Sequence, residues 1–263
     1  MAVVAQTSQL AVALRPRAFV RVAGLDAEEY LQRMVSNDVE ALGVDDVCDA
    51  LLLTPKARVI ATLRIWRRAE DDFLLLTEPE LGGAVLNELR RMRFAAKCEV
   101  EAEEHSSTLV FGGDEGIPNH EYGEPARELL DAELEPTLAP DELERMRIEA
   151  GTPRYGHELG DRVLPAEAGL DRTHISFTKG CYPGQEPIAR LHYRGHVNRR
   201  LRVLEVESGR PGDEIEYDGK SVGRITSAVP GLALAYVRKE VPDDAALSVG
   251  SRTARLHFAP ARP

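Results

Sequence analysis

The segment with the clearest chemical potential is residues 179–186, which read KGCYPGQE. Its cysteine, Cys181, follows Lys179 and precedes a stretch, 184–195, whose composition favours a helix with Pro187 in its first turn. A helix N-terminus and a nearby ammonium both stabilise a thiolate and lower the pKa of a thiol. The sequence therefore predicts a reactive or ligand-competent thiol at Cys181. The structural alternative, a small side chain filling a niche in a turn, stays open.

The other residues of this segment and the other cysteines support different roles. Gly180 and Gly184 allow positive φ and the close approach of another group. The three cysteines are an odd number at wide spacings, which argues against a disulfide framework and against a zinc or iron–sulfur site made by this chain alone. Cys48 borders an apolar strand and Cys98 begins one, so both are interpreted as structural.

No established metal or nucleotide motif accompanies the cysteine segment. His192 and His196 are four residues apart, a spacing that could chelate a metal on a helix, but Gly195 is expected to end the helix between them. The chain contains no GxGxxG, GxxxxGK[ST] or GxSxG pattern. The sequence therefore predicts no metal site and gives no support to a Rossmann, P-loop or hydrolase function.

The net charge of −11 hides a strong asymmetry. Residues 99–149 hold 16 Asp and Glu against 3 Arg, a balance of −13. Residues 187–204, directly after the cysteine segment, hold five arginines, two histidines and no acidic residue. This basic segment indicates an anionic partner, with pairing to the acidic middle region as the alternative.

Periodicity predicts an α+β fold in which strands and helices must position the cysteine segment. A capping-box pattern predicts helices after Asp26 and after Thr77, and a third helix is expected at 141–151 with Gly151 as its C-cap. Residues 112–140 are expected to be irregular. Strands are expected at six places from their alternating or apolar runs: 18–22, 50–54, 59–66, 73–77, 98–103 and 107–111.

From residue 200 onward the pattern changes to short strands and turns. Asp218-Gly219 is a strong hairpin signal, and the whole stretch predicts an antiparallel barrel of five or six strands. The chain is therefore divided into 1–196, with a possible internal break at 112–140, and 197–263. Residues 152–183 read mostly as loop, and a loop of this length inside a compact domain is usually functional.

The stretch from Lys179 to Arg190, K-G-C-Y-x-G-Q-E followed by x-I-A-R, resembles the signature of the YgfZ family. These are folate-binding proteins related to the T-protein, the aminomethyltransferase of the glycine cleavage system. The resemblance covers roughly residues 20 to 240. Further matches lie at Leu31-Gln32 with Ser36-Asn37-Asp38, Leu53-Thr54-Pro55-Lys56 with Arg58, Gly151-x-Pro153, Pro165-x-Glu167 and Gly223-Arg-Ile-Thr226-Ser227.

The resemblance implies a T-protein-like folate-binding region of mixed sheets and helices, with a C-terminal barrel, packed as a ring around a folate cavity. It also implies tetrahydrofolate-linked assistance in assembling or repairing iron–sulfur enzymes, including those that modify tRNA. The partners expected are folate and iron–sulfur proteins or their assembly factors. In this interpretation Cys181 is the functional thiol and Lys179 its neighbour at the cavity. The folate contacts are assigned to the motif residues Gly180, Tyr182, Gly184, Gln185, Glu186 and Arg190.

Folate chemistry suits the basic segment that follows the motif. A pterin needs an apolar slot with a few fixed polar partners, and its glutamyl tail carries carboxylates that arginines bind bidentately. The candidates for the tail, or for an acidic protein partner, are Arg190, Arg194, Arg199 and Arg200.

Several positions depart from the family pattern. Ala57 replaces the glycine of T-P-K-G-R, and Pro183 with Pro187 stiffens the motif. Where T-proteins carry an acidic pair this chain has Ala61-Thr62, and Glu78 stands at an expected asparagine. Because no carboxylate is identified that would act on an aminomethyl–folate adduct, a helper that need not turn over a substrate is favoured. A folate-dependent one-carbon transferase is the alternative.

Two further expectations concern nucleic acid and location. The arginines of 190–202 could contact phosphates, but the charge of −11 and the aromatic content of 5% argue against direct binding of nucleic acid. No run of about 18 apolar residues and no export leader is apparent, so a cytoplasmic protein without membrane contact is expected.

Overall fold

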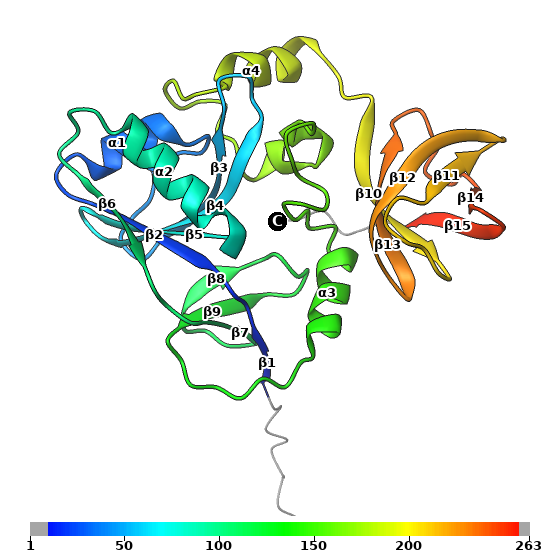
Figure 1. The fold of residues 1–263 in the computed structure, drawn as a ribbon, viewed down its shortest axis with the longest axis horizontal. Coiled ribbons are helices and arrows are strands. Elements are labelled where there is room, and N and C mark those ends of the chain that lie inside the picture. The colour runs from blue at the N-terminus through cyan, green and yellow to red at the C-terminus, as the bar shows by residue number, and fades with distance from the viewer. Residues whose placement is uncertain (1–9, 258–263) are drawn as a thin grey trace, which may run out of the picture.

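The computed structural model describes residues 10–257, which form two antiparallel sheets and a closed barrel arranged as a ring (Figure 1). The predicted α+β class with a C-terminal antiparallel barrel is confirmed. Within these residues, no helix has the length and apolar character needed to cross a membrane.

The first sheet has five strands in the order β3-β4-β5-β2-β6. Helices α1 (Ala27–Met34) and α2 (Gly82–Met92) pack on it, and the Tyr30 hydroxyl on α1 donates to the Leu89 carbonyl on α2. Apolar side chains of the strands and both helices form one buried core, which stabilises this unit by the burial of hydrocarbon. The strands are β2 (Ala18–Ala23), β3 (Val47–Leu53), β4 (Val59–Ala69), β5 (Asp72–Thr77) and β6 (Glu99–Glu103).

Both helices form as predicted, but the capping-box prediction is wrong for each. The Asp26 carboxylate accepts the Lys97 N–H instead of capping α1. The Thr77 hydroxyl donates to the Thr62 carbonyl, and a short 3-10 turn, Pro79–Leu81, precedes α2. Long-range hydrogen bonds to neighbouring strands and loops therefore replace the local ones that the sequence pattern indicated.

The second sheet has four strands in the order β1-β7-β9-β8 and faces helix α3 (Pro140–Glu149). Two of its strands lie in the region predicted to be irregular, so that prediction is wrong. The reason is that β9 turns the carboxylate of Glu128 inward, where Arg17 pairs with it at 2.8 Å, and a buried charge is invisible to an apolar pattern. The strands are β1 (Ala11–Leu14), β7 (Ser107–Phe111), β8 (Ile117–Asn119) and β9 (Ala126–Leu130).

Residues 150–198 connect α3 to the barrel and contain α4 (Gln185–Arg194) and two 3-10 turns, Pro165–Glu167 and Leu170–Arg172. The barrel closes in the order β10-β13-β12-β11-β14-β15. Asp218 and Gly219, with φ of 49° and 71°, form the predicted hairpin turn between β11 and β12. The strands are β10 (Arg199–Val206), β11 (Glu214–Tyr217), β12 (Lys220–Val229), β13 (Gly231–Arg238), β14 (Leu247–Val249) and β15 (Arg252–His257).

Candidate functional site

The cysteine segment packs against the turn between β3 and β4. Gly184 has φ of 85°, and a Cβ there would lie 2.7 Å from the Thr54 carbonyl oxygen and 3.1 Å from the Ala57 Cα. The expectation of positive φ is therefore confirmed for Gly184. It is wrong for Gly180, whose φ is not positive and which has open space around it. Ala57 itself adopts φ of 58°, so it keeps the backbone that a glycine would adopt at this position.

Lys179 ties the same segment to the chain just after α1. Its ammonium donates to the carbonyls of Val35 at 2.9 Å and Asn37 at 2.6 Å. It also lies 5.6 Å from the centroid of the Tyr182 ring. Burial lowers the pKa of Lys179 to about 8, although the charge of Asp38 acts in the opposite direction. Lys179 therefore anchors the thiol loop.

The thiol of Cys181 is exposed, and the loop that carries it leads into α4. The predicted helix after the cysteine is confirmed, and Gly184 is its N-cap. By contrast, Cys98 is buried and Cys48 is half-buried, and burial raises the pKa of the Cys48 thiol to about 12. Among the described residues, Cys181 is thus the thiol that an external molecule can reach.

In the folded protein, a thiol-specific reagent is expected to modify Cys181 and to leave Cys48 and Cys98 unmodified until the chain unfolds. Exposure gives the reagent access to Cys181, while burial shields Cys98 and disfavours the thiolate of Cys48. Mass spectrometry of the labelled peptides measures this, with Cys181→Ser as the control. Equal labelling of Cys48 under native conditions would contradict the assignment.

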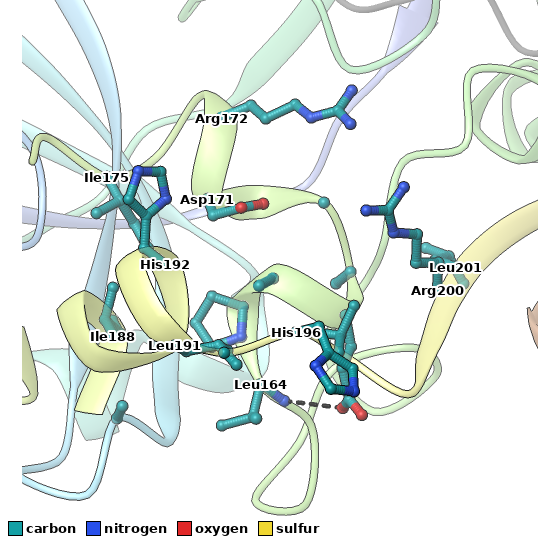
Figure 2. A pocket seen from close by; sticks show the side chains of 18 of the residues that line it. Leu164, Asp171, Arg172, Ile175, Ile188, Leu191, His192, His196, Arg200 and Leu201 are labelled. Atoms are coloured by element: carbon teal, nitrogen blue, oxygen red, sulfur yellow. Dashed lines mark hydrogen bonds between the residues drawn. The ribbon is translucent and has the colours of Figure 1, made fainter. Parts of the chain in front are cut away.

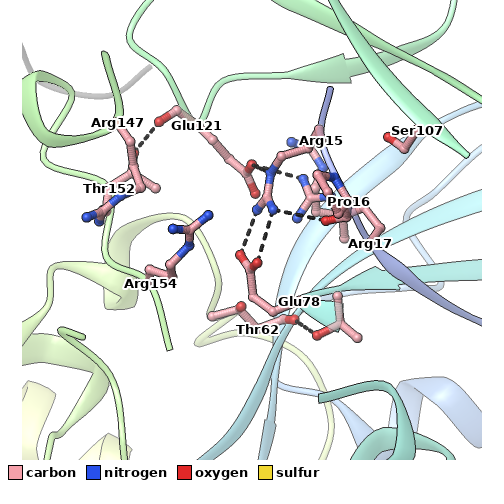
Figure 3. Close-up of polar contacts among 12 residues, drawn as sticks. Arg15, Pro16, Arg17, Thr62, Glu78, Ser107, Glu121, Arg147, Thr152 and Arg154 are labelled. Atoms are coloured by element: carbon pink, nitrogen blue, oxygen red, sulfur yellow. Dashed lines mark hydrogen bonds and ion pairs between the residues drawn. The ribbon is translucent and has the colours of Figure 1, made fainter. Parts of the chain in front are cut away.

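A separate cavity of about 350 Å³ lies between the two sheets, α3 and the connecting segment. Charged side chains from distant parts of the chain meet here (Figure 3). Arg15 binds Glu78 through two hydrogen bonds, 2.6 and 3.0 Å long, and Arg17 binds Glu121 at 2.9 Å. Burial raises the pKa of Glu78, but the hydrogen bonds and charge of Arg15 outweigh it and leave that pKa below its ordinary value. These carboxylates are therefore held ionised by arginines.

Two residues of this cavity have capacity left for a ligand. Arg64 is buried, and its Nε and Nη1 atoms have no hydrogen-bond partner within residues 10–257, while Nη2 donates to the Pro118 carbonyl. The Asp49 carboxylate lies 3.7 Å from Arg64 Nε, too far for a hydrogen bond. Since buried donors are almost always satisfied, Arg64 beside Asp49 is suited to a ligand that both accepts and donates.

Asp49 and Arg64 were not predicted from the sequence. The only signal in the sequence was that Asp49 is the one acidic residue of the otherwise apolar strand β3, VCDALLL. In the register of β3 and β4, the residue opposite Asp49 is Arg64. The motif residues lie elsewhere. Among the described residues, the cavity lining includes none of Lys179, Gly180, Cys181, Tyr182, Gly184, Gln185 or Glu186. Their assignment as functional thiol and folate contacts stays a prediction.

A larger groove of about 1240 Å³ runs between α4, the loop 164–177 and β10. Arg190, Arg194 and Arg200, three of the four candidates for a folate tail or an acidic partner, line it, whereas the Arg199 side chain is paired with Glu167 at 3.0 Å. Pairing of the basic segment with the acidic middle region is wrong: among the described residues, its ion pairs go to Glu167 and Asp243. The same residues contain no cluster of three His, Cys, Asp or Glu that could hold a metal ion.

Comparisons with known proteins agree with this architecture. Residues 198–261 match the family model described as the CAF17 C-terminal beta-barrel domain. A protein of Haemophilus influenzae is 29% identical over 83% of this chain and 84% of its own length. A protein of Pectobacterium carotovorum named tRNA-modifying protein YgfZ is 26% identical over 86% of this chain and 80% of its own length. Several further relatives carry the same name.

Among solved structures, the glycine cleavage system aminomethyltransferase T of Bartonella henselae matches with a TM-score of 0.82 at 18% identity. The match covers 95% of this chain and 86% of the other. The chain therefore has the aminomethyltransferase T fold, completed by a CAF17-type barrel. Within that fold, its sequence is similar to YgfZ proteins along most of its length, and the resemblance carried by the cysteine motif is confirmed.

Proposed function

We propose that this protein binds a reduced folate, tetrahydrofolate or a derivative, in the cavity between its sheets and assists the assembly or repair of iron–sulfur enzymes. The enzymes assisted include ones that modify tRNA, in keeping with the name that several relatives carry. The observation that carries the folate part is the free Nε and Nη1 of Arg64 beside the Asp49 carboxylate, inside a cavity of about 350 Å³.

The chemistry of a pterin matches these two side chains. The pyrimidine part of its ring has a carbonyl oxygen next to an N–H and an amino group, so one edge accepts and donates hydrogen bonds. Arg64 supplies N–H donors for the carbonyl, and Asp49 accepts from the N–H and amino groups. The volume lies at the lower end of the range for small-molecule sites, which suits a flat bicyclic ring.

The position of Cys181 supports action on a partner protein. The thiol is exposed on a loop that Lys179 and Gly184 hold against the first sheet unit, away from the cavity lining. An exposed thiol on a rigid loop is accessible to a large macromolecule such as an iron–sulfur protein. In this proposal one helper protein has two separate sites, the cavity that binds folate and the exposed loop that carries the Cys181 thiol.

Calorimetric titration with tetrahydrofolate tests the folate part. The wild-type chain is expected to give saturable heat, and Asp49→Asn to weaken binding by about tenfold to a hundredfold, because it removes a charge-assisted hydrogen bond. The matched control is Asp161→Asn, because Asp161 is exposed and does not line the cavity, and this variant should bind tetrahydrofolate as the wild type does. Absence of saturable binding by the wild type would refute the folate proposal.

The helper role is tested in cells lacking the native protein. Expression of Cys181→Ala is expected to restore less iron–sulfur enzyme activity than the wild type, while the purified variant keeps its affinity for tetrahydrofolate. Full restoration by Cys181→Ala would remove the thiol from the mechanism.

One observation favours the second candidate, a folate-dependent one-carbon transferase. Asp49 is the cavity carboxylate that no arginine holds by a hydrogen bond among the described residues, since Glu78 and Glu121 are bound by Arg15 and Arg17. A carboxylate that no hydrogen bond holds, beside a bound folate, is suited to proton transfer. Formation of methylene-tetrahydrofolate from an aminomethyl donor, abolished by Asp49→Asn, would favour the transferase over the helper.

A further inference from the structure

Lys179 belongs to the cysteine motif, but its ammonium binds the chain that follows α1. Both hydrogen bonds of the ammonium go to main-chain carbonyls there, to Val35 at 2.9 Å and to Asn37 at 2.6 Å. Asn37 lines the cavity that holds Asp49 and Arg64. The side chain of the motif lysine is therefore joined directly to the wall of that cavity.

Asn37 passes this connection on to Asp49. Its side-chain Nδ2 donates to the Asp49 carbonyl at 2.7 Å and to the Thr173 carbonyl at 3.1 Å, while its own carbonyl accepts from the Lys179 ammonium. Asp49 and Thr173 also line the cavity, from β3 and from the loop on its other side. One residue, held by Lys179, thus fixes two parts of the cavity wall.

The preceding residue, Ser36, joins the same two parts of the chain. Its side chain is buried, and its hydroxyl donates to the His174 carbonyl at 2.6 Å and accepts from the Leu51 N–H at 2.8 Å. Its carbonyl accepts from the Ser176 N–H at 3.0 Å. Ser36 therefore ties β3 to the loop that leads into the cysteine motif.

This loop is short and packed between the cavity and the motif. Thr173 lines the cavity, and Lys179 follows six residues later. Between them Ile175 is buried in one apolar cluster with Ile188 of α4, and Figure 2 shows Ile175 on this stretch beside the helix. Because closely packed chain transmits a displacement, release of the Lys179 ammonium is expected to move the cavity wall.

We propose that Lys179 is a positioning residue of the cavity, which acts through Asn37 to hold Asp49 in place for the bound folate. This inference rests on the proposed folate function, and it gives the motif lysine a role separate from the Cys181 thiol. Among the described residues that line the cavity Lys179 is absent, so it acts on the wall and not on the ligand. A wall that is already fixed loses less conformational entropy when a ligand binds.

The charge of Lys179 gives this role a pH dependence. Burial lowers the pKa of Lys179 to about 8, although the charges of Asp38, Glu40 and Cys48 act in the opposite direction. Asp38 and Glu40 lie on the chain after α1, Cys48 on β3, and the Tyr182 ring centroid is 5.6 Å from the ammonium. Burial raises the pKa of both Cys48 and Tyr182 to about 12, so Lys179 is the member of this group that loses its proton near pH 8.

Calorimetric titration with tetrahydrofolate at two pH values tests the role of Lys179. As the pH rises through the pKa of Lys179, the ammonium becomes a neutral amine, which is a weaker donor. Affinity is therefore expected to fall about threefold to tenfold between about pH 7 and about pH 9. The titrations use the Cys181→Ser background, so that the exposed thiol does not titrate in the same range.

Three lysine variants separate the charge of Lys179 from other effects. At about pH 7, Lys179→Met is expected to bind about tenfold more weakly than its background, with no further loss at about pH 9. Lys179→Arg keeps a cation throughout this range, so its affinity should not depend on pH. The control is Lys220→Met, at an exposed barrel position outside the cavity lining, which should keep both the affinity and its pH dependence.

A double-mutant cycle tests whether Lys179 acts through Asn37. Asn37→Ala removes the hydrogen bond to the Asp49 carbonyl, so Lys179→Met should cause little further loss of affinity in that variant. If Lys179 only stabilised the motif loop, the two losses would add, and the inference would be overturned.

The outcomes distinguish this inference from the proposed function. If the wild type binds no tetrahydrofolate, the folate function fails and the inference fails with it. Folate binding that is equal in the wild type and Lys179→Met leaves the function intact and overturns the inference. A wild-type affinity that does not change with pH overturns it as well, and so does the same pH dependence in Lys179→Arg; these two measurements stand even where Lys179→Met does not fold.

Discussion

Replacing Glu158 with alanine is expected to lower the free energy of unfolding by about 3–5 kcal/mol, since it breaks a buried ion pair from one side. The Glu158 carboxylate is inaccessible to solvent and accepts from Arg147 Nη1 at 3.0 Å, from the Ser227 hydroxyl at 2.6 Å and from the Arg154 N–H at 3.0 Å. Its removal leaves the buried guanidinium of Arg147 with less compensation.

The effect is expected to be large because this network joins three parts of the fold. Arg147 lies on α3, Glu158 on the connecting segment and Ser227 on β12, so one cluster fixes the barrel against the rest of the ring. Arg147 retains a second pair with Glu144 at 2.7 Å, which keeps part of its charge neutralised. Because of that remaining pair, we expect the loss in the free energy of unfolding to be nearer about 3 kcal/mol than about 5 kcal/mol.

Chemical denaturation of the wild type and Glu158→Ala measures the difference. Glu149→Ala is the matched control, because Glu149 is an exposed glutamate of α3 and its loss should change stability by no more than about 0.5 kcal/mol. A loss below about 1 kcal/mol for Glu158→Ala would show that the network does not hold the barrel in place.

Gly184→Ala is the second change with a large expected effect, a loss of about 2–4 kcal/mol in the free energy of unfolding. The backbone there has φ of 85°, which an L-residue adopts only with strain. The new Cβ would also lie 2.7 Å from the Thr54 carbonyl oxygen, a backbone atom that cannot rotate away. The start of α4 or the turn at 54–57 must therefore move.

The matched control is Gly180→Ala, in the same segment. Gly180 has no positive φ, and a Cβ added there would meet nothing within 4 Å, so its substitution should leave stability within about 0.5 kcal/mol of the wild type. Thermal or chemical denaturation compares the two variants. Equal stability of Gly184→Ala and Gly180→Ala would mean that the close contact with the turn does not constrain the thiol loop.

Features that depend on neighbours along the chain were predictable. Alternation and turn residues indicated the barrel and the Asp218-Gly219 hairpin, and the composition after Cys181 indicated α4. Capping at Asp26 was equally local but did not occur, because the Lys97 N–H offers that carboxylate a partner 71 residues away. Strand β9 was missed for a related reason, since only tertiary pairing with Arg17 allows Glu128 to be buried.

Contiguous residues specify the thiol loop, the barrel and the resemblance to YgfZ proteins, so all three could be predicted before the fold was known. Only the folded chain shows that Asp49 and Arg64 share a cavity, that Cys181 is exposed outside its lining, and that Arg190, Arg194 and Arg200 line one groove. The physical reason is that charge pairing and cavity formation depend on distances between elements far apart in the chain. Arg15 and Glu78 are 63 residues apart in sequence, yet a hydrogen bond of 2.6 Å joins their side chains.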